Sequence, residues 1–309
     1  MKAALAALPM ALLYGGRSAE REVSLASARA VRAALEAGGY RLRDIDTGEP
    51  RWWERLGGVR LALNMQHGAG GEDGETQGLL AAMGIACSGS GVLGSALAMD
   101  KIRSKQLWRA AGLPTPDFRV VDAQFDAAAA IAEWGALFVK PAREGSSLGM
   151  ARVDSVAALE AALPTARRHG GAVLAERLVD GPEYTVAILG RRALPPIRIE
   201  AGGDFYDYAA KYRSGTTRYR VPCGLDAAAM AQLQGLALAA FDALGCTVWG
   251  RVDLMRDGSG AFQLLEVNTV PGMTSHSLVP KAAAAAGLDM TALLEEILEL
   301  SLAQAEVQP

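Results

Sequence analysis

The stretch from Lys140 to Gly149, Lys-Pro-Ala-Arg-Glu-Gly-Ser-Ser-Leu-Gly, constrains the fold of this chain more than any other. The apolar run before it, residues 136–139, predicts a buried strand that Lys140 ends and that Pro141 keeps from continuing. Backbone N–H groups in the glycine-containing loop can surround an anion, and the lysine adds a positive charge. The lysine precedes the glycines, so this is not a P-loop. Two interpretations remain, a phosphate-covering loop and an ordinary surface hairpin turn.

The composition limits the class of protein. With 309 residues, a formal net charge of −3 and 50 % hydrophobic residues, we expect a soluble globular protein of two or three domains. The chain lacks the basic surplus of nucleic-acid-binding proteins and has no apolar run near the ~18 residues of a membrane span. The widely spaced Cys87, Cys223 and Cys246 favour reduced thiols over disulfides or a metal cluster.

The N-terminal part predicts an α/β unit. Residues 10–39 indicate a strand, a glycine turn and a helix with Ser18 as N-cap, and this strand is favoured over a signal peptide. Glu20 either complements the helix dipole or faces a ligand at the strand-to-helix crevice. A second strand at 59–65 leads into a glycine-rich polar loop that begins with His67, a residue for which structural and functional roles are equally plausible. The absence of Gly-x-Gly-x-x-Gly speaks against an NAD-dependent oxidoreductase.

The middle of the chain predicts a smaller α+β unit after a linker at 88–91. A helix at 95–111 carries the charge run 100–105, which most simply forms a solvated face. Short strands are expected at 118–121, 137–140, 150–153 and 172–176. They alternate with helices at 127–134 and 156–168, the second broken at Pro164.

The last part combines strands with a long aperiodic loop. Strands are expected at 183–189, 196–200, 247–255 and 262–268, and helices at 227–244 and after residue 277. Residues 204–219 are rich in Tyr, Lys and Arg without alternation, which indicates an ordered functional loop.

The two last strands carry the strongest chemical signal. With a side-chain period of two, Arg251 and Asp253 share one face, and so do Glu266 and Asn268 on the next strand. A hairpin would bring these hard oxygen ligands to one surface, as Mg²⁺ requires. The alternative is a solvent-facing strand pair with cross-strand charges. Apolar neighbours indicate a half-buried site, where unpaired acids are costly, and this favours the metal.

In this order the motifs resemble the ATP-grasp ligases, and within them the D-alanine–D-alanine ligase family most closely. The resemblance covers the whole chain. It rests on the motifs at residues 15–24, 67–74 and 140–149, on Asp253 and the Glu-x-Asn of Glu266 and Asn268, and on Pro-Gly-Met-Thr-x-His-Ser at 271–277. It implies an α/β and α+β chain: an ATP-grasp fold behind a Rossmann-like, pre-ATP-grasp domain. The implied domains are 1–90 (substrate), 91–180 (small ATP-grasp lobe) and 181–309 (C-terminal lobe with the Mg²⁺ site).

The resemblance also implies the role of each site residue. Nucleotide contacts would come from Lys101, Lys140 and Lys211 at the phosphates, Glu176 at adenine, Glu183 at ribose, and Ser147 in the covering loop. Two Mg²⁺ ions, or Mn²⁺, would be held by Asp253, Glu266 and Asn268. Glu20 would bind the first ammonium group and join Ser146 and Tyr212 in one network, while Arg251 and the Gly272 N–H would form an oxyanion hole. Ser277, the Leu278 N–H and nearby His67 would bind the second substrate.

The implied reaction converts one D-alanine to an acyl phosphate with ATP, and the amine of a second D-alanine then attacks it. D-alanyl-D-alanine, a peptidoglycan precursor, would be made in the cytoplasm by a homodimer. Tyr212, where D-lactate-using relatives tend to have Phe, favours the dipeptide, and a related ligase with D-lactate or D-serine as acceptor is the alternative. A non-catalytic ATP-binding module is disfavoured, because the set Asp253, Glu266, Asn268 and Arg251 is complete. Two departures from the family are Arg177, often Lys, and Gln66, usually apolar.

Overall fold

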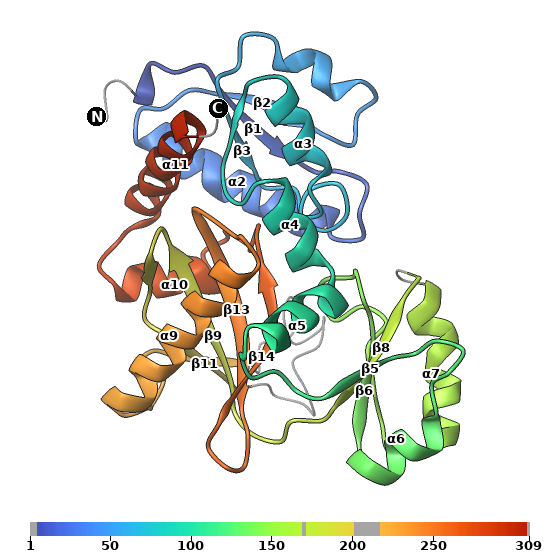
Figure 1. The fold of residues 1–309 in the computed structure, drawn as a ribbon. Coiled ribbons are helices and arrows are strands. Elements are labelled where there is room, and N and C mark those ends of the chain that lie inside the picture. The colour runs from blue at the N-terminus through green and yellow to red at the C-terminus, as the bar shows by residue number, and fades with distance from the viewer. Residues whose placement is uncertain (1–4, 169–170, 201–216, 308–309) are drawn as a thin grey trace.

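The computed structural model describes residues 5–168, 171–200 and 217–307, which form three sheets with their helices (Figure 1). The first sheet is parallel with the order β2-β1-β3-β4. Its strands are β1 (Met10–Tyr14), β2 (Leu42–Asp46), β3 (Leu61–Asn64) and β4 (Ala86–Cys87). Helices α2 (Arg21–Ala37) and α3 (Glu75–Ala82) and the 3₁₀ helix η1 (Trp52–Leu56) complete the unit.

Two expectations for this first unit need correction. Helix α2 begins after Glu20, so Ser18 is not its N-cap; the Ser18 hydroxyl instead accepts a hydrogen bond from the Glu20 N–H at 3.2 Å. Strand β2 was not predicted, because its sequence Leu-Arg-Asp-Ile-Asp buries one residue at the edge of the sheet. An edge strand that buries so little of its surface lacks the apolar run that marks β1.

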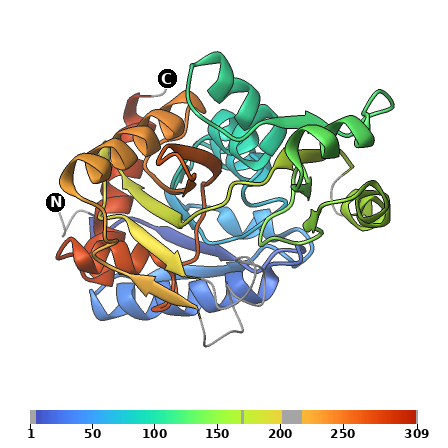
Figure 2. The same cartoon turned by 90° about the horizontal axis from the view of Figure 1, so that it is seen from below.

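The second sheet is antiparallel with the order β5-β8-β6-β7. Its strands are β5 (Phe118–Val120), β6 (Leu137–Pro141), β7 (Ala151–Val153) and β8 (Val173–Arg177). Helices α6 (Ala127–Trp134) and α7 (Val156–Arg168) pack on it, and α7 lies on the outer side of this small lobe (Figure 2). Strand β6 ends at Pro141, which still pairs with Val173, so this proline keeps the strand from continuing as expected. Helix α7 continues through Pro164, so the break expected there is wrong.

The third sheet is antiparallel with the order β12-β11-β9-β13-β14, and β10 pairs with β9. Its strands are β9 (Glu183–Leu189), β10 (Arg192–Ala193), β11 (Ile197–Glu200), β12 (Arg218–Arg220), β13 (Trp249–Arg256) and β14 (Phe262–Asn268). Alternate residues of β9 enter two different cores. Val186 and Ile188 pack with α9 (Ala227–Ala243), while Ala187 and Leu189 pack with α10 (Leu278–Ala285).

Three helices connect the units. The helix expected over 95–111 is two helices, α4 (Val92–Met99) and α5 (Lys101–Ala110), because the Asp100 carboxylate caps α5 by accepting from the N–H groups of Ile102 and Arg103. Helix α11 (Met290–Val307) returns to pack against α2 of the first unit (Figure 1). The described ranges contain no helix that is both long enough and apolar enough to span a bilayer.

Candidate active site

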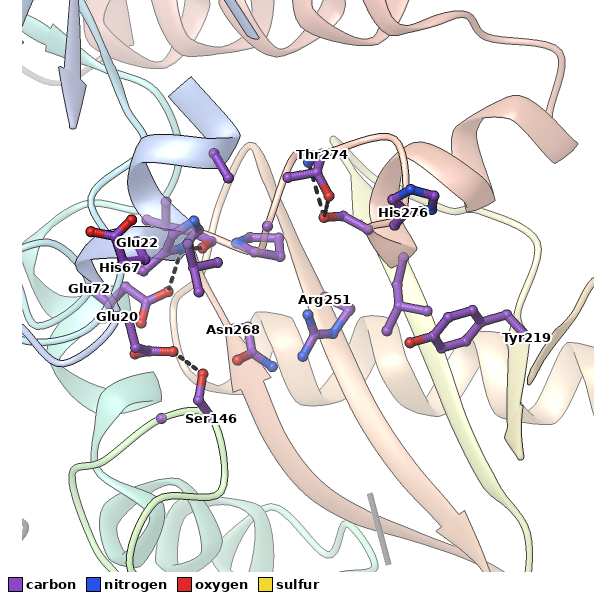
Figure 3. Close-up of a pocket in the computed structure, with 18 residues that line it drawn as sticks. Glu20, Glu22, His67, Glu72, Ser146, Tyr219, Arg251, Asn268, Thr274 and His276 are labelled. Carbon is purple, nitrogen blue, oxygen red and sulfur yellow. Dashed lines mark hydrogen bonds and ion pairs between the residues drawn. The ribbon is translucent and has the colours of Figure 1, made fainter. Parts of the chain in front are cut away.

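A cavity of about 470 Å³ lies where the first unit, the loop after β6 and the third sheet meet. Figure 3 shows side chains from all three converging on it. The expected site residues that line it are Glu20, His67, Ser146, Arg251, Asn268, Gly272, Ser277 and Leu278. The structure therefore brings together residues that are up to 258 positions apart in the chain.

Glu20 and Ser146 join the first unit to the loop after β6. The Ser146 hydroxyl donates to Glu20 Oε1, and Glu20 is buried (Figure 3). A Cβ atom at Gly145 would lie 2.7 Å from Glu20 Oε2, so only glycine permits this approach. Ser146 and Ser147 have φ values of 52° and 59°, which non-glycine residues seldom adopt. Strain of this kind persists where surrounding contacts enforce it, and here the Glu20 contact is one of them.

His67 is buried and holds the turn after β14. Its Nδ1 lies 2.7 Å from the Val270 carbonyl oxygen, which can only accept, so Nδ1 carries the proton. Its Nε2 lies 3.1 Å from Ser27 Oγ. Burial lowers the pKa of His67, but the carboxylates of Glu72 and Glu20 and the Val270 carbonyl outweigh it, and the pKa is raised.

Ser27 is a site residue that the sequence analysis missed. Its Oγ also accepts the Met273 N–H at 3.1 Å, so it ties α2 to the turn that contains Gly272. Ser24 and Ser27 are both fully buried on the apolar face of α2. Two serines three residues apart within an apolar helical stripe are the sequence signal that could have identified them.

The turn 272–277 precedes α10 and presents polar groups to the cavity. Ser277 Oγ accepts the Thr274 N–H at 3.0 Å and lies 2.9 Å from Thr274 Oγ1 (Figure 3). A Cβ atom at position 272 would lie 3.0 Å from Ser277 Oγ, so Gly272 lets the turn close tightly. Ser277 is the N-cap of α10 and Leu278 its first residue, where backbone N–H groups lack intrahelical acceptors.

The hairpin β13–β14 places the predicted metal ligands side by side. Asp253 pairs with Glu266 and Arg251 with Asn268 across the ladder. Arg251 donates to both Asp253 oxygens, at 2.9 and 2.7 Å, and Asn268 Nδ2 lies 3.1 Å from Asp253 Oδ2. Lys101 Nζ lies 3.1 Å from Glu266 Oε2. A cationic side chain thus accompanies each of the two carboxylates.

This donor set fits Mg²⁺. No group of three or more His, Cys, Asp or Glu side chains that could hold a metal occurs in the described part of the chain. The hairpin offers two carboxylates and one amide, and Mg²⁺ typically takes few protein ligands because substrate phosphates and waters complete its shell. The Glu266 side chain is 21 % exposed, so its oxygens are accessible to an entering ion.

A second charged cluster, formed by Lys105, Lys140 and Glu176, lies at the end of β6, next to the loop 142–150 that we call the covering loop. Lys140 Nζ donates to Glu176 Oε1, and Lys105 Nζ lies 2.5 Å from Glu176 Oε2. Burial raises the pKa of Glu176, but the two lysines outweigh it and the pKa lies below its usual value. Lys105 was not predicted as a site residue. The solvated face expected for 100–105 is wrong, because Lys101 and Lys105 are both buried.

The other predicted residues are placed as follows. Lys101 Nζ donates to the Glu144 carbonyl at 2.7 Å, which links α5 to the covering loop. Glu183 is the first residue of β9 and is half-buried. Arg177, where the family often has Lys, is the last residue of β8 and is exposed. Lys211 and Tyr212 lie outside the described residues.

Gln66, the other departure from the family pattern, now has a structural explanation. It is buried, and its Oε1 accepts from the Thr47 hydroxyl at 2.7 Å. Its amide fills the space between two turns, because Cβ atoms at Gly16 and Gly70 would lie 3.1 and 2.8 Å from Gln66 Nε2. An apolar side chain could fill the same space but could not accept from Thr47.

Comparisons with known proteins agree with this fold and site. A family model described as the D-ala D-ala ligase C-terminus matches residues 107–299. The D-alanine–D-alanine ligase of Ectopseudomonas mendocina (strain ymp) is 54 % identical over 292 residues, which cover 94 % of this chain and 93 % of that protein. The enzyme of Stutzerimonas stutzeri (strain A1501) is 53 % identical over 296 residues, 95 % of this chain and 94 % of that protein.

Solved structures give the same result. The crystal structure of the D-alanine–D-alanine ligase from Bacillus anthracis complexed with ATP has a TM-score of 0.87 at 33 % identity and covers 98 % of this chain and 100 % of that chain. The VanG D-Ala:D-Ser ligase from Enterococcus faecalis has a TM-score of 0.81 at 31 % identity, over 95 % and 99 % of the two chains. The expected ATP-grasp fold behind a parallel N-terminal sheet is confirmed. By sequence and by fold, this chain belongs to the D-alanine–D-alanine ligase family.

Proposed function

We propose that this chain joins two molecules of D-alanine to form D-alanyl-D-alanine, with conversion of ATP to ADP and phosphate, and so supplies a peptidoglycan precursor. The observation that carries the proposal is that Glu20, Arg251 and Ser277 line the same cavity. It lies in a chain that is 54 % identical to a D-alanine–D-alanine ligase over 94 % of its length.

The first D-alanine would be held by its ammonium group at Glu20. This carboxylate is buried and already hydrogen-bonded to Ser146, so it offers a fixed negative charge beside the covering loop. Closing the loop and binding the ammonium group would then depend on the same carboxylate. Tyr212 would complete this network from the long loop.

Formation of the peptide bond creates a negatively charged oxygen on the tetrahedral intermediate. Arg251 reaches the cavity from β13 (Figure 3). Gly272, whose N–H would be the second donor, lines the same cavity from the turn before α10. Two fixed donors facing one developing charge can lower the barrier by a few kcal/mol, about 3 for a single donor. His67 holds that turn through Val270 and Ser27, so we assign it a positioning role beside the second substrate.

The second D-alanine would place its carboxylate at the start of α10. There the Ser277 hydroxyl and the Leu278 N–H face the cavity, and the helix N-terminus favours a negative charge. The amine of this substrate would then point toward the acyl phosphate between Arg251 and Gly272.

The ATP phosphates would lie between the covering loop and the hairpin β13–β14. Lys101, Lys140 and Lys211 would contact the phosphates, Ser147 would cover them, and Glu176 and Glu183 would bind adenine and ribose. Asp253, Glu266 and Asn268 would hold the two Mg²⁺ ions. Bound Mg²⁺ would offset the charge that moves with the γ-phosphoryl group.

D-serine is the second candidate acceptor, because a D-Ala:D-Ser ligase shares the fold with a TM-score of 0.81. Phosphate release measured with D-alanine alone, with D-alanine plus D-serine, and with D-alanine plus D-lactate separates the acceptors, and mass spectrometry identifies each product. We expect turnover with D-alanine alone and D-alanyl-D-alanine as the main product in every mixture. No ATP turnover with D-alanine alone would refute the main proposal, and a predominant mixed product would reassign the acceptor.

We further propose the domain boundaries 1–90, 91–180 and 181–309, a homodimeric assembly and a cytoplasmic location. Each of the three sheets falls within one of these ranges, which supports the boundaries. Light scattering on the purified protein tests the dimer, which a mass of one chain would exclude.

A further inference from the structure

The cluster of Lys105, Lys140 and Glu176 contains two cations and one anion. Their side chains are 1 %, 8 % and 2 % exposed, respectively, so water screens them little. One carboxylate cannot neutralise two ammonium groups, and the cluster therefore carries one net positive charge. A buried net charge is costly until a ligand of opposite sign offsets it.

The two lysines differ in how completely they are satisfied. Lys105 Nζ lies 2.7 Å from Thr115 Oγ1 and 3.3 Å from the Leu264 carbonyl oxygen in addition to its contact with Glu176. An ammonium group has three donors, and Lys105 makes two hydrogen bonds and one ion pair within the protein. In the described part of the chain, the only hydrogen-bond acceptor of Lys140 Nζ is Glu176. The unused hydrogen-bonding capacity of the cluster therefore lies on Lys140.

On the basis of the proposed ATP-dependent function, we propose that Lys105 is a positioning residue for nucleotide phosphate binding. It shares the Glu176 carboxylate with Lys140 and so prevents Lys140 and Glu176 from forming a neutral, self-contained pair. The positive charge that remains at Lys140 is available to a phosphate group. Burial lowers the pKa of Lys105 to about 8, which still leaves it mostly protonated at neutral pH.

The geometry explains why a lysine that touches no substrate would matter. Lys105 lies on α5, Glu176 on β8 and Leu264 on β14, so the contacts of one side chain connect the small lobe to the strand that carries Glu266. Without Lys105 the same carboxylate would face Lys140 alone. Two opposite charges in close contact cancel much of each other's attraction for a polyanion.

The test compares binding of ADP and adenosine by calorimetry, at fixed Mg²⁺ concentration, in the full-length protein. In Lys105→Met we expect ADP to bind at least about tenfold more weakly, equivalent to ~1.4 kcal/mol, with adenosine binding unchanged within about twofold. Lys105→Arg keeps the charge and should restore more than half of the ADP-binding free energy lost in Lys105→Met. Arg103→Met removes a charge from an exposed position on the same helix and serves as the matched control.

A double variant separates charge sharing from a general structural role. Lys105→Met with Glu176→Gln leaves Lys140 unpaired and restores one net positive charge. Its preference for ADP over adenosine should therefore be larger than that of Lys105→Met alone, and adenosine binding corrects for the proposed contact of Glu176 with adenine. Unchanged ADP binding in Lys105→Met, an equal loss for ADP and adenosine, or a double variant with a smaller preference for ADP over adenosine than the single one would each overturn the inference. If the wild-type protein binds no ADP, the proposed function fails and the inference fails with it.

Discussion

Two charged clusters flank the proposed path of the nucleotide phosphates, and they differ in charge balance and in burial. At the hairpin β13–β14, two cations, Arg251 of β13 and Lys101 of α5, accompany two acids, Asp253 and Glu266. Behind the covering loop, Lys105 and Lys140 share the single acid Glu176. The cluster at the hairpin is balanced in charge and more accessible, so we expect that a metal ion can take the place of Lys101 beside Glu266. The cluster around Glu176 is buried and has a net positive charge, so we expect it to bind only an anion. Lysines and carboxylates thus have different binding properties in the two clusters, because the clusters differ in burial and in the ratio of cations to anions.

The largest effect should come from the accessible cluster. We expect Glu266→Gln to lower kcat by about 10³-fold or more, because it removes a proposed metal ligand where charge would move in the transition state. The free energy of unfolding should change by less than about 1 kcal/mol, since Glu266 is partly exposed. Phosphate release and urea unfolding measure the two quantities. Glu160→Gln, at an exposed position on α7, is the matched control, and a wild-type rate in Glu266→Gln would remove the metal assignment.

The buried cluster should respond mainly through stability. Glu176→Met leaves two lysines facing each other without a counter-charge, and breaking a buried pair in this way costs about 3–5 kcal/mol. We expect a corresponding shift in the urea midpoint. A loss below about 1 kcal/mol would show that the cluster is less shielded from water than its burial indicates, and the comparison of the two clusters would then fail.

The pH dependence of stability should also distinguish the clusters. Lys105 has a pKa of about 8 in the folded protein against 10.5 as its ordinary value. Between these values the unfolded chain retains a proton that the folded protein has lost, so stability rises with pH. The free energy of unfolding of the wild type, relative to Lys105→Met, should increase by about 2 kcal/mol from pH 8 to pH 10. A difference that stays flat or falls would mean that Lys105 keeps its proton in the folded state.

The smallest effect concerns the loop that covers the cavity. Ser146→Ala removes one hydrogen bond to the buried Glu20 carboxylate, which is worth about 1.5–3 kcal/mol. Part of this loss should appear as a roughly tenfold lower kcat/KM for D-alanine in initial-rate measurements. Ser259→Ala, in the exposed turn between β13 and β14, should leave the rate unchanged. Equal rates in the two variants would exclude a role for the Ser146 hydroxyl.

Several elements could be predicted to the residue from the sequence, and others could not. The strands at 183–189 and 262–268 and the helix at 127–134 match the structure, because apolar runs between clear breaks define them. Edge strand β2 depends on pairing with a strand far away in the sequence, so no local pattern predicted it, whereas the break at Asp100 is a local N-cap that the sequence analysis missed. In the site, motif order identified Glu20 and Ser146, whereas Ser27 and Lys105 belong to no motif and became visible only through their contacts.

The packing of α11 on α2 has a consequence for how the chain folds during synthesis. Val31 and Leu35 of α2 share one core with Leu294 and Ile297 of α11. The ribosome makes α2 early and α11 last, after both antiparallel sheets have emerged. Until then the part of this core that α11 fills has no native cover. A nascent chain that stalls before Met290 should therefore expose this part of the core and become a substrate for chaperones.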